Sequence, residues 1–219
     1  EVSIVFPTGP NPPFNDSIQF KRLKKERIIV QKSDEWFTVR KTMLTASTLH
    51  DALKKSNKSL IKKKCETSKP FKGSDATRWG IKYEDVAIKF YELHNNVKVH
   101  EFGVIRHKLY HFIGASPDGI TPQGIMIEIK CPFSRPLKLG EVPDKYFTQV
   151  QAQLEVCNLT YCDYLECKIK EYKSLTHYMD DTKNHNEKVL KTLDNSDKGC
   201  IITYIDSNNE EKYYYSELG

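Results

Sequence analysis

The hydrophobic side chains of residues 75–94 recur at steps of three and four, the spacing of one face of an α-helix. The positions that carry this pattern are Ala76, Trp79, Tyr83, Val86, Ala87, Phe90 and Tyr91. Ser74 or Asp75 can cap this helix. Similar spacing predicts a second helix over residues 144–157, and a short helix after Ser33 or Asp34.

Alternating apolar and β-branched residues indicate strands. The clearest run is GIMIEIKC at residues 124–131, and further strands are predicted within 97–105, 110–115 and 160–170. Residues 199–215 are typical of a hairpin that turns at residues 207–209. This order predicts a mixed α/β (α+β) domain, in which helices flank a central mixed sheet of about five strands.

Three segments lack a clear apolar pattern. Residues 1–20 contain four of the prolines and are predicted to form an extended arm. Residues 54–72 carry eight lysines and one acid, which favours either a solvated helix or a mobile loop. Residues 180–195 are polar and helix-like. We expect residues 21–219 to form a single domain, with its core motifs in 36–156 and its C-terminal strands in 160–215.

Composition limits the compartment. A chain of 219 residues can bury a core without disulfides, and its six cysteines have no framework spacing. Residues 1–20 lack the basic and apolar regions of a signal peptide. The apolar runs are too short to cross a bilayer. We therefore expect an intracellular protein, in the cytoplasm or nucleus, that is neither secreted nor bound to a membrane.

The net charge of +5 conceals an uneven distribution. Residues 21–72 hold 16 Lys and Arg against 5 Asp and Glu, which is +11, and the rest of the chain is −6. Such a split predicts a polyanionic partner for the basic block and a cation for the acidic remainder.

The residues with the clearest chemical potential surround the strand at 124–131. Glu128 and Lys130 are two residues apart, so they project from the same face of the strand. A hairpin from 110–118 to 124–131 would bring Asp118 beside Glu128. Two neighbouring carboxylates resist joint ionisation unless a cation shares the site, and oxygen ligands favour Mg²⁺, to which the Ile129 carbonyl could add. Such an ion can lower the pKa of a bound water, which Lys130 could orient.

Each part also has an ordinary explanation. Ser-Pro-Asp-Gly at 116–119 is a good generic turn, and a Glu-x-Lys pair on a strand is commonly a surface ion pair. The conjunction favours chemistry, because Glu128 and Lys130 interrupt a strand that otherwise looks buried.

Pro117-Asp118 followed by Glu128-Ile129-Lys130 resembles the signature of the PD-(D/E)XK nuclease superfamily. Four segments in order resemble its phage lambda exonuclease, or YqaJ-type viral recombinase, branch. They are WFTVRKTMLTAS at 36–47, RWGIKYED at 78–85, GASPDGI…IEIKCPF within 114–133 and YFTQVQAQLEV at 146–156. The resemblance implies a restriction-endonuclease-like core.

The resemblance also implies roles. Asp118 and Glu128 would be metal ligands with the Ile129 carbonyl, Lys130 the catalytic lysine, and Glu84 an additional acid. Helical periodicity alone is neutral on whether Glu84 faces the site.

A second group of residues would bind the substrate. Arg40, Ser47 and Ser116 would hold a 5′-phosphate, for which an Arg fork and Ser hydroxyls are suited. Gln149, and less directly Gln151, match an active-site Gln. The ordinary alternatives are an ion pair of Arg40 with Asp34 or Glu35, and solvent-exposed glutamines on a helix.

The implied function is an Mg²⁺-dependent deoxyribonuclease, with Mn²⁺ as a substitute and one or two ions. It would act as a 5′→3′ exonuclease on duplex ends in recombination, repair or viral DNA processing. A single-strand annealing protein is the implied partner, and residues 54–72 are expected to grip the DNA backbone. An endonuclease, an RNA-degrading enzyme and a silent nucleic-acid-binding module are the alternatives. An iron–sulfur cluster on Cys65, Cys157, Cys162 and Cys167 is disfavoured, because residues 162 and 167 would face opposite sides of a strand.

Overall fold

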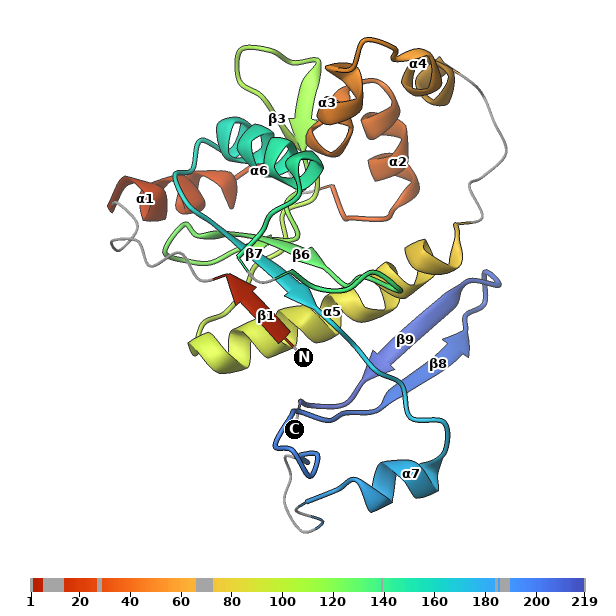
Figure 1. Cartoon of the computed structure of the whole chain (residues 1–219). Helices are drawn as coiled ribbons and strands as arrows, with labels where there is room; N and C mark the ends of the chain where they lie inside the picture. The colour runs from red at the N-terminus through yellow and green to blue at the C-terminus, as the bar shows by residue number, and fades with distance from the viewer. Residues whose placement is uncertain are drawn as a thin grey trace.

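The computed structural model of the chain describes residues 2–5, 14–26, 29–65, 73–138, 140–183, 185 and 190–218 (Figure 1). The helices are α1 (Phe14–Leu23), α2 (Asp34–Lys41), α3 (Ala46–Ala52), α4 (Lys58–Cys65), α5 (Asp75–Asn95), α6 (Asp144–Cys157) and α7 (Leu175–Asp180). The strands are β1 (Val2–Val5), β2 (Leu44–Thr45), β3 (Ile105–Arg106), β4 (Ile113–Ala115), β5 (Gly119–Ile120), β6 (Met126–Lys130), β7 (Cys162–Cys167), β8 (Ile201–Ile205) and β9 (Glu211–Tyr215). None of these helices is long and apolar enough to span a bilayer.

The predicted mixed α/β class is confirmed, but the sheet is divided differently. The central sheet has four strands in the order β1-β7-β6-β5, and β6 and β7 run parallel. The predicted strands at 97–105 and 110–115 contribute β3 and β4 to a second sheet, β2-β4-β3. Pro117 has no backbone N–H, so the chain leaves that sheet after β4 and enters the central sheet as β5.

The central sheet lies between two helices, with α6 on one side and α5 on the other (Figure 1). Residues of β6 alternate between the two layers. Met126 packs in the cluster that includes Val150 of α6, whereas Ile127 and Ile129 pack in the cluster that includes Tyr83 and other residues of α5. Because side chains alternate along a strand, Glu128 points to the α6 side of the sheet together with Met126.

The two long predicted helices are confirmed. In α5 the Ser74 side chain accepts a hydrogen bond from the Thr77 N–H, so Ser74 is the cap. Helix α6 occupies the predicted 144–157 and ends at Asn158, which adopts the left-handed conformation that terminates many helices. The short helix α2 is capped by Ser33.

The prediction of an extended arm over residues 1–20 is wrong where the chain is described. Strand β1 pairs antiparallel with β7, and α1 begins at Phe14. The side chain of Asp16 is buried and accepts hydrogen bonds from the backbone N–H and hydroxyl of Thr160. The four prolines all lie in residues 6–13, outside the described part.

The prediction of a helix over 180–195 is also wrong for its described residues. The helical turns occur earlier, in α7, and residues 181–183, 185 and 190–195 are not helical. The buried ammonium of Lys198 donates to the carbonyls of Tyr178 and Asp181, and so satisfies the end of α7. A cation at this position stabilises the last carbonyls of a helix and favours its termination there.

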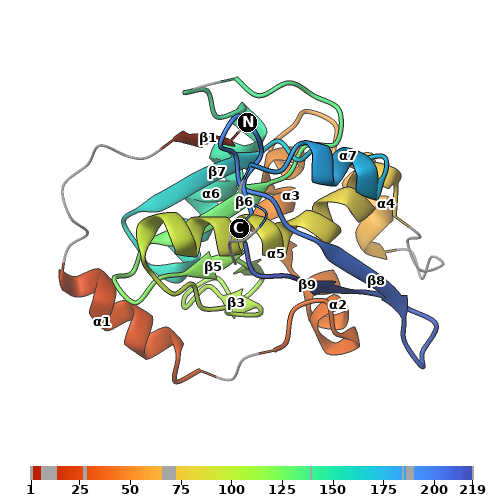
Figure 2. The ribbon, with the colours of Figure 1, turned by 90° about the horizontal axis from the view of Figure 1, so that it is seen from below.

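The C-terminal hairpin is confirmed as β8 and β9, with Ile201 opposite Tyr215. It lies next to α5 in both ribbon views (Figures 1 and 2). The hydroxyl of Tyr215 donates to the carbonyl of Lys82 on α5 at 2.8 Å, which anchors the hairpin to that helix.

The lysine-rich stretch forms α4, a helix with no buried residue, over its first half. Residues 66–72 lie outside the described part. The ammonium of Lys64 donates to the carbonyls of Arg40 (2.8 Å) and Met43 (2.9 Å). This lysine therefore fastens α4 to the end of α2.

We expect Gly124→Ala to lower the free energy of unfolding by about 3 kcal/mol, since strain and a clash combine. Gly124 has φ +87°, and a Cβ there would lie 2.5 Å from the Asp16 backbone. Gly140→Ala is the control, because Gly140 has φ +75° but open space around it, so only about 1 kcal/mol is expected. Urea titration of both variants measures the difference. Equal losses would show that α1 does not pack against Gly124.

Candidate active site

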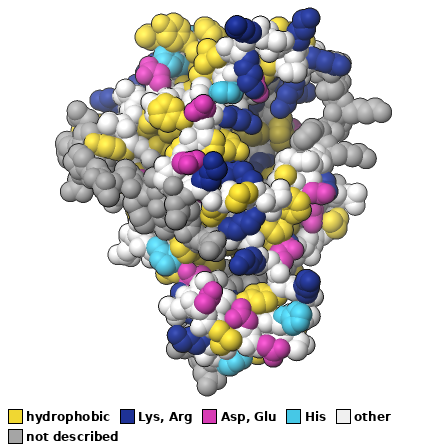
Figure 3. Space-filling view, in the orientation of Figure 1, with side chains coloured by type: hydrophobic (Ala, Val, Ile, Leu, Met, Phe, Trp, Pro, Cys, Tyr) yellow, Lys and Arg dark blue, Asp and Glu magenta, His cyan; other side chains and the backbone are white. Residues whose placement is uncertain are grey.

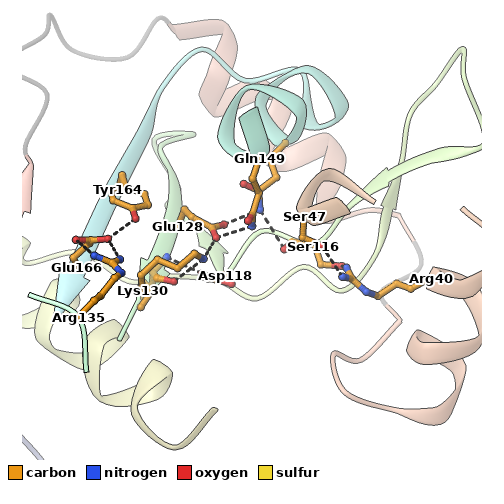
Figure 4. Close-up of polar contacts among 12 residues, drawn as sticks. Arg40, Ser47, Ser116, Asp118, Glu128, Lys130, Arg135, Gln149, Tyr164 and Glu166 are labelled. Atoms are coloured by element: carbon orange, nitrogen blue, oxygen red, sulfur yellow. Dashed lines mark hydrogen bonds and ion pairs between the residues drawn. The ribbon is translucent and has the colours of Figure 1, made fainter. Parts of the chain in front are cut away.

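A cleft of about 160 Å³ opens where the hairpin β5–β6 meets helices α2, α3, α5 and α6. It brings together eight side chains that the sequence singles out: Arg40, Ser47, Glu84, Ser116, Asp118, Glu128, Lys130 and Gln149. Figure 4 shows Arg40, Ser47 and Ser116 at one end of the row of residues and Asp118, Glu128 and Lys130 in its middle.

Glu128 is fully buried at the centre of the cleft. One carboxylate oxygen, Oε1, accepts hydrogen bonds from the Lys130 ammonium and, at 2.7 Å, from Gln149 Nε2. The other, Oε2, accepts from Gln153 Nε2 at 2.8 Å. These donors satisfy a charge that would otherwise be very unfavourable in the protein interior.

Asp118 follows Pro117 and stands next to Glu128, because Gly119 pairs with Ile127 in the β5–β6 hairpin. Its Oδ2 accepts a hydrogen bond from the Ile129 N–H at 2.7 Å. Burial raises the pKa of Asp118 well above its usual value, and the negative charge of Glu128 raises it further. The sequence analysis expected two neighbouring carboxylates that resist joint ionisation unless a cation shares the site, and the raised pKa of Asp118 agrees with that expectation.

Lys130 is the cation inside this group. Burial alone would lower the pKa of Lys130, but the charges of Glu128 and Asp118 outweigh burial and hold this pKa above its usual value. Its Nζ also donates to the Ile129 carbonyl at 2.9 Å and lies 5.1 Å from the centre of the Tyr146 ring. The ammonium is thus charged and held in position from several sides.

Glu84 reaches the cleft from α5. Helical periodicity alone had not indicated whether this side chain faces the site. Tyr83 and Ala87 of the same helix are buried against the sheet, and Glu84 is one residue further around the helix. Burial raises the pKa of Glu84, and Lys32, which forms an ion pair with it at 3.2 Å, opposes that shift. This acid is thus already matched by a cation.

Arg40 lies at the end of the cleft formed by α2 and α3, beside the group of Asp118, Glu128 and Lys130. Its guanidinium donates to Ser116 Oγ at 3.0 Å and to Ser47 Oγ at 3.2 Å, and it lies 4.1 Å from the centre of the Trp36 ring. Burial lowers the pKa of Arg40 to about 10, while the charge of Asp118 opposes that shift. No carboxylate in the described part of the chain forms an ion pair with Arg40. A cation surrounded by hydroxyls and an aromatic ring is suited to an anionic ligand.

The structure corrects one residue of the predicted site. Gln151 is exposed on α6 and does not line the cleft, whereas Gln153 is buried and does. Gln149 and Gln153 are four residues apart and share one face of the helix, and Gln151 is turned about 200° away from Gln149. This i, i+4 spacing was the signal in the sequence that identifies Gln153.

Further cleft residues were missed as site residues, among them Lys32, Trp36 and Gln31. The indole Nε1 of Trp36 donates to Ser116 Oγ at 3.2 Å, and Gln31 Nε2 donates to the Pro117 carbonyl at 3.0 Å. Trp36 precedes Arg40 by four residues, so their contact could have been expected on a helix. Gln31 lies in a segment without regular structure and has no sequence signal.

The donor set has the chemistry that a hard divalent ion requires. Asp118, Glu128 and the carbonyl of Ile129 all offer oxygen ligands, and the Lys130 ammonium forms an ion pair with Glu128. Within the described residues, no group of three or more His, Cys, Asp or Glu side chains is arranged so that it could hold a metal ion by itself. This is compatible with Mg²⁺, which usually keeps several waters and uses few protein ligands.

Comparison with known proteins agrees with this geometry. The profile of the YqaJ-like viral recombinase domain matches residues 35–163. An uncharacterized protein of Acanthamoeba polyphaga mimivirus is 36% identical over 221 residues, which cover 89% of this chain but only 40% of that protein.

Two solved structures are similar. One is an alkaline exonuclease from Laribacter hongkongensis, with a TM-score of 0.58 and 27% identity over 64% of this chain and 76% of that chain. The other is the same exonuclease in complex with dAMP, with a TM-score of 0.56 and 25% identity over the same shares. With more than half of its length matched by the domain profile, the chain belongs to the YqaJ-like viral recombinase family.

Proposed function

We propose that this chain is a metal-dependent deoxyribonuclease that removes nucleotides from the 5′ ends of duplex DNA. The observation that carries the proposal is the joint position of two chemically different groups in one cleft. Asp118, Glu128 and Lys130 form its centre, and the guanidinium fork of Arg40 lies beside them. The similar alkaline exonuclease, which also binds dAMP, supports this substrate class.

Asp118, Glu128 and the Ile129 carbonyl would hold Mg²⁺ or Mn²⁺, with Glu84 acting directly or through water. When bound, the ion supplies charge neutralisation at the phosphate and a more acidic water. Lys130 donates a hydrogen bond toward the attacking water and stabilises the negative charge that develops on the phosphate oxygens. Gln149 and Gln153 keep the Glu128 carboxylate in one orientation.

Arg40, Ser47 and Ser116 would bind the terminal 5′-phosphate and so fix the scissile bond over the carboxylates. A 5′→3′ direction follows from this proposal, since the pocket would recognise the end from which digestion begins. Lys and Arg side chains run in a band down the middle of one face of the molecule (Figure 3). That band and α4 suit a polyanion whose binding weakens with salt. We infer a role in viral DNA recombination or repair, with an annealing protein as partner.

The test compares five substrates in Mg²⁺: linear duplex DNA, closed circles, nicked circles, single-stranded DNA and RNA. Preferential loss of linear duplex from its ends supports the proposal. Cutting of closed circles, which have no ends, would indicate an endonuclease, degradation of RNA an RNase, and binding without cutting a silent module.

Arg40→Ala is expected to reduce the preference for 5′-phosphorylated over 5′-hydroxyl ends by about 30-fold, because a charge-assisted fork is lost. Arg40→Lys keeps the charge without the fork and should recover only part of the preference. The measurement is the ratio of kcat/KM for the two ends. Arg106→Ala, an exposed arginine of β3, is the matched control and should leave this ratio unchanged. If Arg40→Ala and the native chain showed the same preference, the pocket around Arg40 would not be the binding site of the 5′-phosphate.

A further inference from the structure

A second cavity, of about 460 Å³, lies on the side of Lys130 that faces away from Arg40. We call it the distal cavity. Its walls are the first half of α5 and the segment Cys131–Arg135 that follows β6. Glu84 and Lys130 line both the distal cavity and the active-site cleft, so the two adjoin at these side chains, and we call them together the trough. In Figure 4 Arg135 lies at the opposite end of the row of residues from Arg40.

Gly80 forms part of the α5 wall of the distal cavity. It lies inside a helix of 21 residues, where glycine is less favourable than alanine. Beyond its own helix, a Cβ at this position would have no atom of the described residues within 4 Å, so close packing against that part of the chain does not explain the glycine. The missing side chain instead widens the trough where it passes α5.

The opposite wall offers a surface for a nucleotide. The Phe133 ring is 48% exposed and contacts Trp79 edge-on, with ring centres 5.2 Å apart. A half-exposed ring fixed by an aromatic neighbour can stack on a base of any sequence. Thr77 and Ser134 add hydroxyl groups to the same cavity.

The segment that carries Phe133 is held in place by contacts with β7 and the residue that follows it. Arg135 forms an ion pair with the buried Glu166, whose carboxylate also accepts from the Tyr164 hydroxyl at 2.5 Å. The ammonium of Lys168 donates to the carbonyls of Phe133 and Arg135. This wall is therefore formed before any ligand binds, which reduces the entropic cost of binding.

We propose that the distal cavity binds the nucleotide on the 3′ side of the scissile phosphate, with the sugar–phosphate backbone passing over Gly80 and a base against Phe133. The proposal rests on the function proposed above and deepens it. It makes Gly80 a determinant of substrate binding and explains why a helix retains an unfavourable residue with open space around it.

The test introduces larger side chains at Gly80, which would reduce the space in the distal cavity. Gly80→Ala is expected to raise Tm by about 2 °C, since alanine favours the helix, and yet to weaken substrate binding. Gly80→Val should raise KM for linear duplex by at least about 10-fold with a smaller change in kcat. The matched control is Leu93→Phe, which adds volume at an exposed position of the same helix outside the trough, and it should leave KM unchanged.

Binding provides a second readout, with Ca²⁺ in place of Mg²⁺ to prevent cutting. Thymidine 5′-monophosphate reaches only the active-site cleft, whereas 5′-phosphorylated dT4 also crosses the distal cavity. Gly80→Val should weaken dT4 binding by about the same factor as KM and leave the mononucleotide unaffected. The proposal would be overturned if folded Gly80→Val bound dT4 as tightly as the native chain does. If valine lowers Tm, Gly80→Ala takes its place in this test. Failure of the native chain to cut any DNA would instead refute the proposed function.

Discussion

Lys130→Met is expected to lower kcat on linear duplex DNA by at least about 10³-fold, because the ammonium that orients water and stabilises the developing charge is lost. Its KM should change far less, since the 5′-phosphate pocket around Arg40 is intact. Single-turnover assays in Mg²⁺ measure the chemical step directly. A rate within about 10-fold of the native chain would exclude Lys130 from catalysis.

The same substitution should also destabilise the metal-free fold, which must be separated from the catalytic effect. Without Lys130, Glu128 is a fully buried carboxylate with no partner cation, and such a loss costs about 3 kcal/mol or more. We expect a decrease in Tm of roughly 6–12 °C.

A double variant, Lys130→Met with Glu128→Gln, tests this explanation. The amide at 128 can donate to Gln153 Oε1, which has no hydrogen-bond partner in the described structure, once the Gln153 amide is flipped. Its stability should recover while activity stays absent. A double variant that remains as unstable as Lys130→Met would indicate that Lys130 stabilises the fold by packing and not by charge.

Removal of divalent ions should abolish hydrolysis, and their addition should stabilise the fold. Asp118 and Glu128 repel each other and share one lysine, so an ion that binds between them relieves that repulsion. At 100 times its dissociation constant, such an ion adds about 2.7 kcal/mol, which corresponds to a rise in Tm of roughly 5–10 °C. Thermal melts with EDTA, Mg²⁺ and Mn²⁺ measure this shift.

Asp118→Asn provides the specific control for that shift. The amide oxygen introduced at this position can still accept from the Ile129 N–H, so the fold should be retained and its metal-free Tm should equal or exceed that of the native chain. The metal-dependent rise in Tm should disappear. Asp51→Asn, which changes a carboxylate paired with Lys54 outside the cleft, should keep the full rise. A full rise in Asp118→Asn as well would place the ion elsewhere.

Local patterns predicted the central elements of the fold accurately. The apolar spacing located α5 and α6, and the alternation of Ile127, Glu128 and Ile129 indicated which side chains enter the core. These predictions succeed because helices and strands bury one face, and the period of that face is visible in a single segment. The same periodicity failed at 180–195, where Lys198, a residue outside the segment, satisfies the end of α7.

Contacts between distant segments could not be derived in this way. The pairing of β1 with β7 joins residues about 160 positions apart, and nothing in residues 2–5 indicates its partner. The assignment of the strands at 97–115 to a second sheet depends likewise on β2. Cross-strand pairing is a property of two segments together, so a pattern within one of them leaves it open.

The candidate site was likewise predictable in part from local sequence and in part only from the tertiary structure. The sequence by itself determined which residue types were available for phosphodiester chemistry: a carboxylate after a turn, a Glu-x-Lys strand, and an upstream Arg among hydroxyls. Only the tertiary structure decided that Glu84 faces the cleft, that Gln153 and not Gln151 reaches Glu128, and that Gly80 opens the trough beyond Lys130. The physical reason is that each of these residues acts across a gap between elements, and the width and direction of such a gap are set by how the helices pack on the sheet.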